Sequence, residues 1–211
     1  MYQEDNTETR LGWSLEQRDP QFIQTLMPFW EWLYHHYFRV QTSGWEHIPE
    51  EGRVLFVGSH NGGMAAPDMF MMMYDWFRRF GYDRPVYGLM HPLTWEIAPK
   101  LAQLAAKTGA ILAHPKMASA ALRQGASLLV YPGGPQDLFR PYEKRHQIYF
   151  AGRQGFIKLA LREEVAIVPV ISTGAHDTFI VIADLYEKLH EINQWGIPWP
   201  FGLDPQVFPI Y

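Results

Sequence analysis

The chain has 211 residues, a length that suits a single domain with a sizeable hydrophobic core. Its formal net charge is −4 and it has no block of like charges, so the composition gives no indication of nucleic-acid binding. The absence of cysteine excludes disulfide bonds, thiolate catalysis and zinc sites with cysteine ligands. There is no secretory signal and no run of about 20 apolar residues, so we expect a cytoplasmic protein without a membrane-spanning helix.

The N-terminal part of the chain combines a polar segment with an aromatic one. We expect residues 1–19 to form a polar, poorly ordered segment that precedes the domain. Asp19 and Pro20 are typical of a helix N-cap and a first helical position, and the helix is predicted to reach about Val40, with a kink or break at Pro28. Aromatic residues surround this helix, so it is expected either to lie buried against a sheet or to place one side on a membrane.

Short apolar runs alternate with helical patterns through the rest of the chain. Strands are predicted at residues 54–57, 86–89, 110–113, 127–131 and 166–171. Helices are predicted at residues 68–80, 95–107, 116–124, 156–162 and 185–194. This alternation predicts an α/β fold in which residues 20–211 form a single domain, with a mixed, mainly parallel sheet wrapped by helices.

Glycine and polar residues follow the first predicted strand, in the run Gly58–Asp68. Open α/β sheets bind ligands at the carboxyl ends of their strands, so His60 stands where a catalytic side chain is expected. Histidine titrates near neutral pH and can take a proton from a hydroxyl, which makes His60 a candidate general base. A buried structural histidine is the alternative. Its neighbours Asn61, Gly62 and Gly63 are candidate substrate-binding residues.

Asp68 is the nearest carboxylate that can orient His60 and stabilise its protonated form. Eight residues of helix would separate the two by about 12 Å, so a contact requires the intervening segment to fold back. The glycines and Pro67 of this segment favour such a turn. Alternatively, Asp68 is a first-turn acid stabilised by the helix dipole.

A second glycine-containing run, Tyr131-Pro132-Gly133-Gly134, follows the fourth predicted strand. Glycine allows a ligand to approach the backbone, and the amide groups of such a turn can bind an oxyanion or a phosphate. These four residues are therefore candidates for substrate binding, and an ordinary tight turn is the alternative.

Cations alternate with aromatic residues between positions 140 and 155. Arg140, Arg145 and Arg153 are candidates to hold the phosphates of a carrier such as coenzyme A. The alternative is a solvated surface loop. These residue types alone do not decide between the two.

His176 and Asp177 follow the fifth predicted strand and are expected at the same edge of the sheet as His60. His176 is a further candidate for substrate binding, and a simple turn is the alternative. The methionines of the run Met69–Met73 are expected mainly to lie on a helix and pack in the hydrophobic core, rather than to line a tunnel for an acyl chain.

Together these motifs resemble the glycerolipid acyltransferase superfamily. His60 and Asp68 correspond to its first motif, with seven residues between them, more than is usual in the family. Later motifs match in the same order, at Tyr131–Gly134, Arg145–Ala160 and Val168–Val170. The long first motif and the Pro-Gly-Gly turn are similar to the branch that contains monoacylglycerol and diacylglycerol acyltransferases and their bacterial relatives.

The resemblance implies transfer of a fatty acyl group from acyl-CoA or acyl carrier protein to a hydroxyl of a glycerolipid or similar lipid. It implies His60 as the general base, Asp68 as the carboxylate that orients it, and amide groups near Gly133 and Gly134 as donors to an oxyanion. The acyl thioester is a co-substrate, and no metal or other cofactor is expected. The expected partners are the thioester donor, the lipid acceptor and, by peripheral contact, a membrane, with no nucleic acid.

Departures from the family pattern keep other interpretations open. The segment Gly109–Pro115 lacks the arginine with which family members recognise glycerol phosphate, which argues against a phosphorylated acceptor. The family chain usually continues beyond a segment such as Val207–Pro209, so an end at Tyr211 is compatible with a C-terminally shortened domain. A non-catalytic lipid-binding protein on the same fold is one alternative, and a lipid thioesterase or hydrolase is another. The Gly-x-Ser-x-Gly motif of serine hydrolases and the Gly-x-Gly-x-x-Gly motif of dinucleotide enzymes are both absent.

Overall fold

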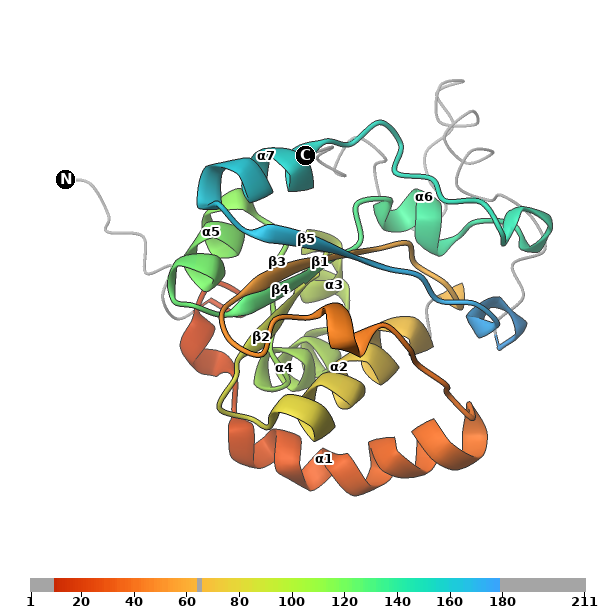
Figure 1. Cartoon of the computed structure of the whole chain (residues 1–211), viewed down its shortest axis with the longest axis horizontal. Helices are drawn as coiled ribbons and strands as arrows, with labels where there is room; N and C mark the ends of the chain where they lie inside the picture. The colour runs from red at the N-terminus through yellow and green to blue at the C-terminus, as the bar shows by residue number, and fades with distance from the viewer. Residues whose placement is uncertain (1–9, 64–65, 179–211) are drawn as a thin grey trace.

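The computed structural model describes residues 10–63 and 66–178, and the helix expected at 185–194 lies outside this range. The strands are β1 (Val54–Gly58), β2 (Val86–Met90), β3 (Ala110–Leu112), β4 (Ser127–Val130) and β5 (Ala166–Val170). The α-helices of the described residues are α1 (Pro20–Trp32), α2 (Pro67–Phe80), α3 (Pro92–Ile97), α4 (Pro99–Lys107), α5 (Pro115–Arg123), α6 (Gly134–Leu138) and α7 (Gly155–Glu163). Figure 1 shows the sheet between α1 and α2 on one side and α5 and α7 on the other.

The strands form one parallel sheet in the order β3-β2-β4-β1-β5. In the register of β1, Leu55 lies opposite Leu128 of β4 and Ile167 of β5. All five residues of β1 are buried, as expected for a strand with cover on both faces. The prediction of an α/β fold with a mainly parallel sheet is confirmed, and every pairing between the described strands is parallel.

The two faces of the sheet carry separate hydrophobic cores. Successive strand residues point to opposite faces, so Phe56 packs with α1 and α2 whereas Leu55 packs with α5 and α7. The first core is rich in aromatic side chains, among them the fully buried Trp76. Met71 and Met73 belong to this core, which confirms the expected core role for these two methionines.

The helix boundaries differ from the sequence prediction in three places. The first helix passes through Pro28, ends as α1 at Trp32 and continues as a π-helical turn over Leu33–Tyr37, so its irregularity lies beyond the proline. The helix predicted at 95–107 is divided in two, because Pro99 begins α4 at a first helical position. The short helix α6 has no counterpart in the prediction, since its five residues carry too little periodicity.

Residues 10–18 correct the expectation for the N-terminal segment, and β5 is less covered than β1. Residues 10–18 are not poorly ordered, because Trp13 and Leu15 pack against the second core and the Tyr87 hydroxyl donates to the Leu15 carbonyl oxygen at 3.0 Å. β5 lies at the edge of the sheet, and the side chain of its Ile167 is 40% exposed. Cover on both faces is therefore complete for β1 but not for β5 among the described residues.

Candidate active site

The candidate site lies where the chain changes direction across the sheet. From β1 the chain crosses to β2 over one face of the sheet, whereas from β4 it crosses to β5 over the other face, so the carboxyl ends of β1 and β4 lie where open α/β sheets generally bind their ligands. His60 follows β1 and Tyr131 follows β4, and their rings stack with centroids 3.9 Å apart at 14°. Gly58 permits this, because a Cβ atom there would lie 2.6 Å from the Tyr131 ring. The fold thus joins two motifs that are far apart in the sequence.

His60 and Asp68 face each other across a tight turn. His60 Nδ1 lies 3.3 Å from Asp68 Oδ2, and the same oxygen accepts a 3.0 Å hydrogen bond from the backbone N–H of Asn61. Gly62 and Gly63 have φ angles of +85° and +57°, which reverse the chain between the two residues. The fold-back required by the sequence is therefore present. The His60–Asp68 contact has an ion-pair distance without the angle of a hydrogen bond.

The side chains of His60 and Asp68 differ in their exposure to solvent. The Asp68 side chain is 1% exposed and lies in the first turn of α2, where the helix dipole also favours its charge. The His60 side chain is 17% exposed, so its ring keeps contact with solvent. Burial, together with the charges of Asp68 and Asp137, raises the pKa of Tyr131 well above its ordinary value. His60 therefore stacks on a neutral phenol ring and faces a buried carboxylate at Nδ1.

A buried ion pair from the segment after β4 holds the loop that carries His60. Asp137 in α6 accepts hydrogen bonds from the Ser59 hydroxyl, at 2.9 Å, and from the backbone N–H of His60. Arg140 pairs with Asp137 and donates to the His60 carbonyl oxygen at 2.9 Å and to the Asn61 side-chain oxygen at 2.7 Å. Asp137 is 0% exposed and Arg140 is 4% exposed.

This ion pair was not evident from the sequence. Arg140 stands there among the candidate phosphate-binding cations, whereas the structure buries its guanidinium among protein acceptors. The only sequence feature that points to the pair is an acidic residue three positions before an arginine, after a glycine pair. Nothing in the sequence indicates that Ser59 contacts Asp137. Burial raises the pKa of Asp137, although Arg140 and the hydrogen bonds donated by Ser59 and His60 oppose this shift.

Arg153 shapes the Pro-Gly-Gly turn. It donates to the carbonyl oxygens of Pro132 and Gly133, at 3.1 and 2.7 Å. A Cβ atom at Gly133 would lie 2.2 Å from Cβ of Asp137, so the turn packs directly against the ion pair. Arg153 thus binds the protein backbone in this structure, rather than projecting as a free cation.

The amide group of Gly134 is used within the same turn. Its N–H donates to the carbonyl oxygen of Tyr131 at 3.2 Å, and Gly134 itself has a φ of +54°. The expectation that this amide faces an oxyanion is therefore wrong for the described conformation. For Gly133 the same expectation stays a prediction.

A pocket of about 150 Å³ lies beside the His60 loop, with Asn61, Arg140, Arg145 and His176 among its lining residues. His176 Nε2 lies 3.0 Å from an Arg140 nitrogen, and burial together with the Arg140 charge lowers the pKa of His176. Arg145 stacks over the ring of Tyr142 at 4.1 Å. Four of the predicted site residues therefore meet at this pocket, whereas Arg153 is not in its lining.

The described residues contain no group of three or more histidine or acidic side chains arranged to hold a metal ion. The acyltransferase family profile matches residues 39–173, which include His60, Asp68 and the whole five-stranded sheet. The chain belongs to the acyltransferase family.

Relatives of this chain occur in mycobacteria and in a plant. An uncharacterized protein of Mycobacterium tuberculosis strain H37Rv is 28% identical over 193 residues, which cover 91% of this chain and 52% of that protein. A protein of Mycobacterium leprae is also 28% identical over 193 residues, covering 91% and 51%. The chloroplastic phytyl ester synthase 2 of Arabidopsis thaliana is 25% identical over 147 residues, covering 66% and 20%. The chain thus spans about half the length of these mycobacterial relatives, and no solved structure matches it.

Proposed function

We propose that this acyltransferase moves a fatty acyl group from acyl-CoA or acyl carrier protein to a hydroxyl of a glycerolipid or similar lipid. The observation that carries the proposal is the buried Asp68 carboxylate 3.3 Å from His60, at the carboxyl end of β1 and inside the matched segment. The Pro-Gly-Gly turn beside His60 supports the branch of monoacylglycerol and diacylglycerol acyltransferases and their bacterial relatives. The plant relative is named for making phytyl esters, which supports a hydroxyl acceptor.

In the proposed reaction, His60 Nε2 takes the proton of the acceptor hydroxyl while Nδ1 faces Asp68. The hydroxyl oxygen attacks the carbonyl carbon of the thioester and forms a tetrahedral oxyanion. Its collapse breaks the carbon–sulfur bond, and the leaving thiolate takes the proton from the His60 imidazolium. The products are an ester and a free thiol. Asp68 stabilises the imidazolium, and general base catalysis contributes about 10²–10⁴-fold to the rate.

The experiment measures release of free thiol from palmitoyl-CoA, with and without monoacylglycerol, diacylglycerol or a lysophospholipid. We expect release that depends on the acceptor and falls by at least about 100-fold in His60→Ala. His47→Ala is the matched control, because that side chain is 81% exposed and lies before β1, whereas His60 follows it. Turnover that persists in a folded His60→Ala variant contradicts general base catalysis by His60.

The same assay separates the alternatives. Thiol release that needs no acceptor indicates a thioesterase or hydrolase. Absence of release with every donor and acceptor, together with lipid binding that survives His60→Ala, indicates a lipid-binding protein on an acyltransferase fold. Repeating the assay with acyl carrier protein as the donor distinguishes an inactive chain from one that requires the other thioester.

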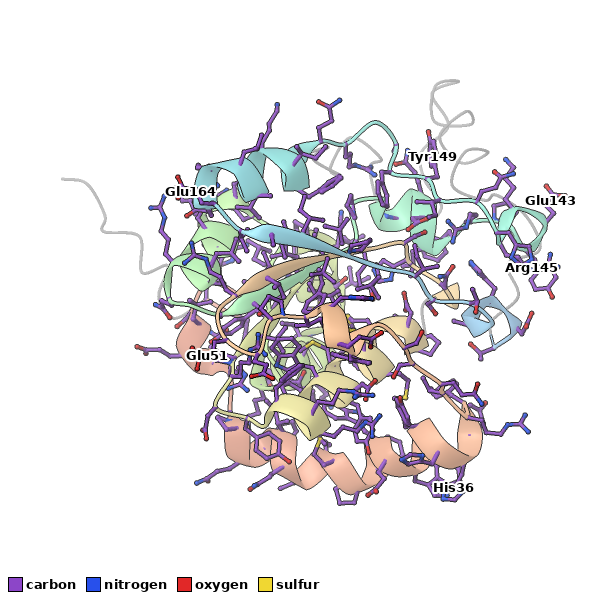
Figure 2. All side chains as sticks on the ribbon, in the orientation of Figure 1. His36, Glu51, Glu143, Arg145, Tyr149 and Glu164 are labelled. Carbon is purple, nitrogen blue, oxygen red and sulfur yellow. The ribbon has the colours of Figure 1, made fainter. Side chains whose placement is uncertain are left out.

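The proposed location is cytoplasmic and peripheral on a membrane. No helix of the described residues is long and apolar enough to cross a membrane. Phe29, Trp32 and Tyr37, here called the aromatic surface, are 58%, 53% and 60% exposed at the end of α1 and in the following π-helical turn. The exposed Arg39 lies nearby in the sequence. Aromatic side chains with an adjacent cation suit the headgroup region of an anionic bilayer. Figure 2 places His36, from this turn, toward the same side of the view as Arg145.

Sedimentation with phosphatidylglycerol vesicles tests this location. We expect Trp32→Glu to reduce binding, because a carboxylate is repelled by the anionic surface and replaces an interfacial ring. Leu161→Glu is the matched control, since that apolar side chain is 76% exposed on α7, on the other face of the sheet. An equal loss of binding in both variants contradicts the assignment of the aromatic surface.

A further inference from the structure

We propose that Asp137 and Arg140 are positioning residues that fix the catalytic histidine through its backbone. The proposal rests on the proposed function, in which His60 is the base. Both backbone polar groups of His60 are bound to this pair: Asp137 accepts from its N–H and Arg140 donates to its carbonyl oxygen. The peptide planes on either side of the His60 Cα atom are therefore held by a single ion pair from another loop.

The side chains next to His60 are held by the same pair. The Ser59 hydroxyl donates to Asp137 at 2.9 Å, and the Asn61 side-chain oxygen accepts from Arg140 at 2.7 Å. With residues 59–61 fixed in this way, the His60 ring has little freedom besides its own side-chain rotation. That rotation is limited by the Tyr131 ring, whose centroid lies 3.9 Å from that of His60. The base is thus held beside Asp68, and Asp137 acts on it only through the backbone.

An arginine is required here because one planar group must satisfy several acceptors at once. Arg140 also donates to the Gln147 carbonyl oxygen and lies 3.0 Å from His176 Nε2, so it joins the β1 loop, the segment after α6 and the loop after β5. A lysine ammonium has three donors and no fork, so it cannot make the same set. The guanidinium is 4% exposed and is directed at protein acceptors, which argues against a role in holding a donor phosphate.

The decisive variant removes both charges together, as Asp137→Asn with Arg140→Met. Replacing one partner of a buried ion pair leaves an unpaired buried charge and can unfold the chain, whereas replacing both charged residues by neutral ones is often tolerated. We expect this double variant to fold, to keep the KM for the donor, and to lose about 100-fold in kcat, as for a misplaced catalytic group.

Two further variants complete the test. Arg140→Lys keeps the charge and is expected to retain an intermediate kcat. Glu163→Gln is the control, because that buried carboxylate also pairs with arginines but lies before β5, at the amino end of the sheet.

A second readout does not depend on turnover. Stacking on Tyr131 shifts the ring-proton signals of His60 upfield in the NMR spectrum, and His60→Ala identifies these signals. We expect them to move toward ordinary histidine positions in the double variant and to stay in place in Glu163→Gln. If the parent protein shows no acyl transfer, the proposed function fails, and the NMR signals still decide whether Asp137 and Arg140 position His60.

The inference is overturned if the His60 signals do not move in the folded double variant, or if its kcat stays within about threefold of the parent. It is also overturned if Arg140→Lys raises the KM for the thioester while kcat is unchanged, because Arg140 would then bind the donor. Displaced His60 signals with a lowered kcat and an unchanged KM support it.

Discussion

Among the buried carboxylates that pair with arginines, Asp137 and Glu163 lie at opposite ends of the sheet, and only Asp137 has a buried arginine partner. Arg140, the partner of Asp137, is 4% exposed, whereas the side chain of Arg123, which lies 2.9 Å from Glu163, is 67% exposed. Figure 2 shows the two ends apart, with Arg145 near the first and Glu164 beside the second. The hydrogen bond from Arg123, with further help from Ser119 and Arg162, lowers the pKa of Glu163 to about 2. Burial raises the pKa of Asp137.

The difference shows what each pair contributes. Where the arginine stays in water, the pair favours the ionised carboxylate, so it adds stability. Where both partners are buried, desolvation outweighs their attraction, and such a pair is poor evidence for stability. The Asp137–Arg140 pair therefore has its main consequence in geometry at His60, and the Glu163 pair has its main consequence in the folding equilibrium.

The largest expected effect is at the carboxyl end of the sheet, in Asp68→Asn. The amide no longer stabilises the imidazolium of His60, so we expect kcat to fall by about 10²–10⁴-fold in the thiol-release assay. Glu163→Gln should leave kcat unchanged and so sharpen the contrast between the two ends. A folded Asp68→Asn variant with near-parental turnover would remove Asp68 from the mechanism.

A smaller effect is expected for Gly133→Ala. The added Cβ would lie 2.2 Å from Cβ of Asp137 and 2.6 Å from the Tyr149 carbonyl oxygen, so the turn must shift against the ion pair. We expect the free energy of unfolding to fall by about 1–3 kcal/mol, measured by urea denaturation.

Gly88→Ala is the control for this substitution, because a Cβ atom there meets nothing within 4 Å. It should change the free energy of unfolding much less, and kcat not at all. Equal destabilisation by the two alanines would contradict close packing between the Pro-Gly-Gly turn and Asp137.

The smallest effect is expected for Glu163→Gln, and it depends on pH. The folded-state pKa of Glu163 is about 2 and its ordinary value is 4.5, so the ionised pair adds stability that is fully present above about pH 4.5 and is lost as the pH falls toward 2. Melting temperatures measured across this range should converge for the parent and the variant at the acid end. A constant difference at every pH would show that the charge of Glu163 is not responsible.

The sequence predicts the central strands well because burial on both faces leaves a continuous apolar signal. β1 and β4 are found where their apolar runs lie, and the glycine loops after them mark the carboxyl edge. The edge strand β5 carries the same kind of run although part of it is exposed, since periodicity does not report position within a sheet. Helix α6 is too short for periodicity to reveal.

The site can be predicted from the sequence only where residues close in the chain are also close in the fold. His60 and Asp68 are close in the chain, so a turn between them can be foreseen from Gly62 and Gly63. Arg140 and Arg153 look alike in the sequence, yet one clamps the His60 loop and the other shapes the Pro-Gly-Gly turn. Their roles depend on which carbonyl groups the fold places nearby, and that information is not local.

The contact between Gly58 and Tyr131 restricts how this family of chains can diverge. A side chain at position 58 would occupy the space of the Tyr131 ring, since even a Cβ atom would lie 2.6 Å from it. A larger residue at position 58 therefore fits this packing only if position 131 carries a smaller side chain. In descendants of this sequence we therefore expect a larger residue at 58 to be inherited together with a smaller one at 131, although the two positions lie at the ends of different strands.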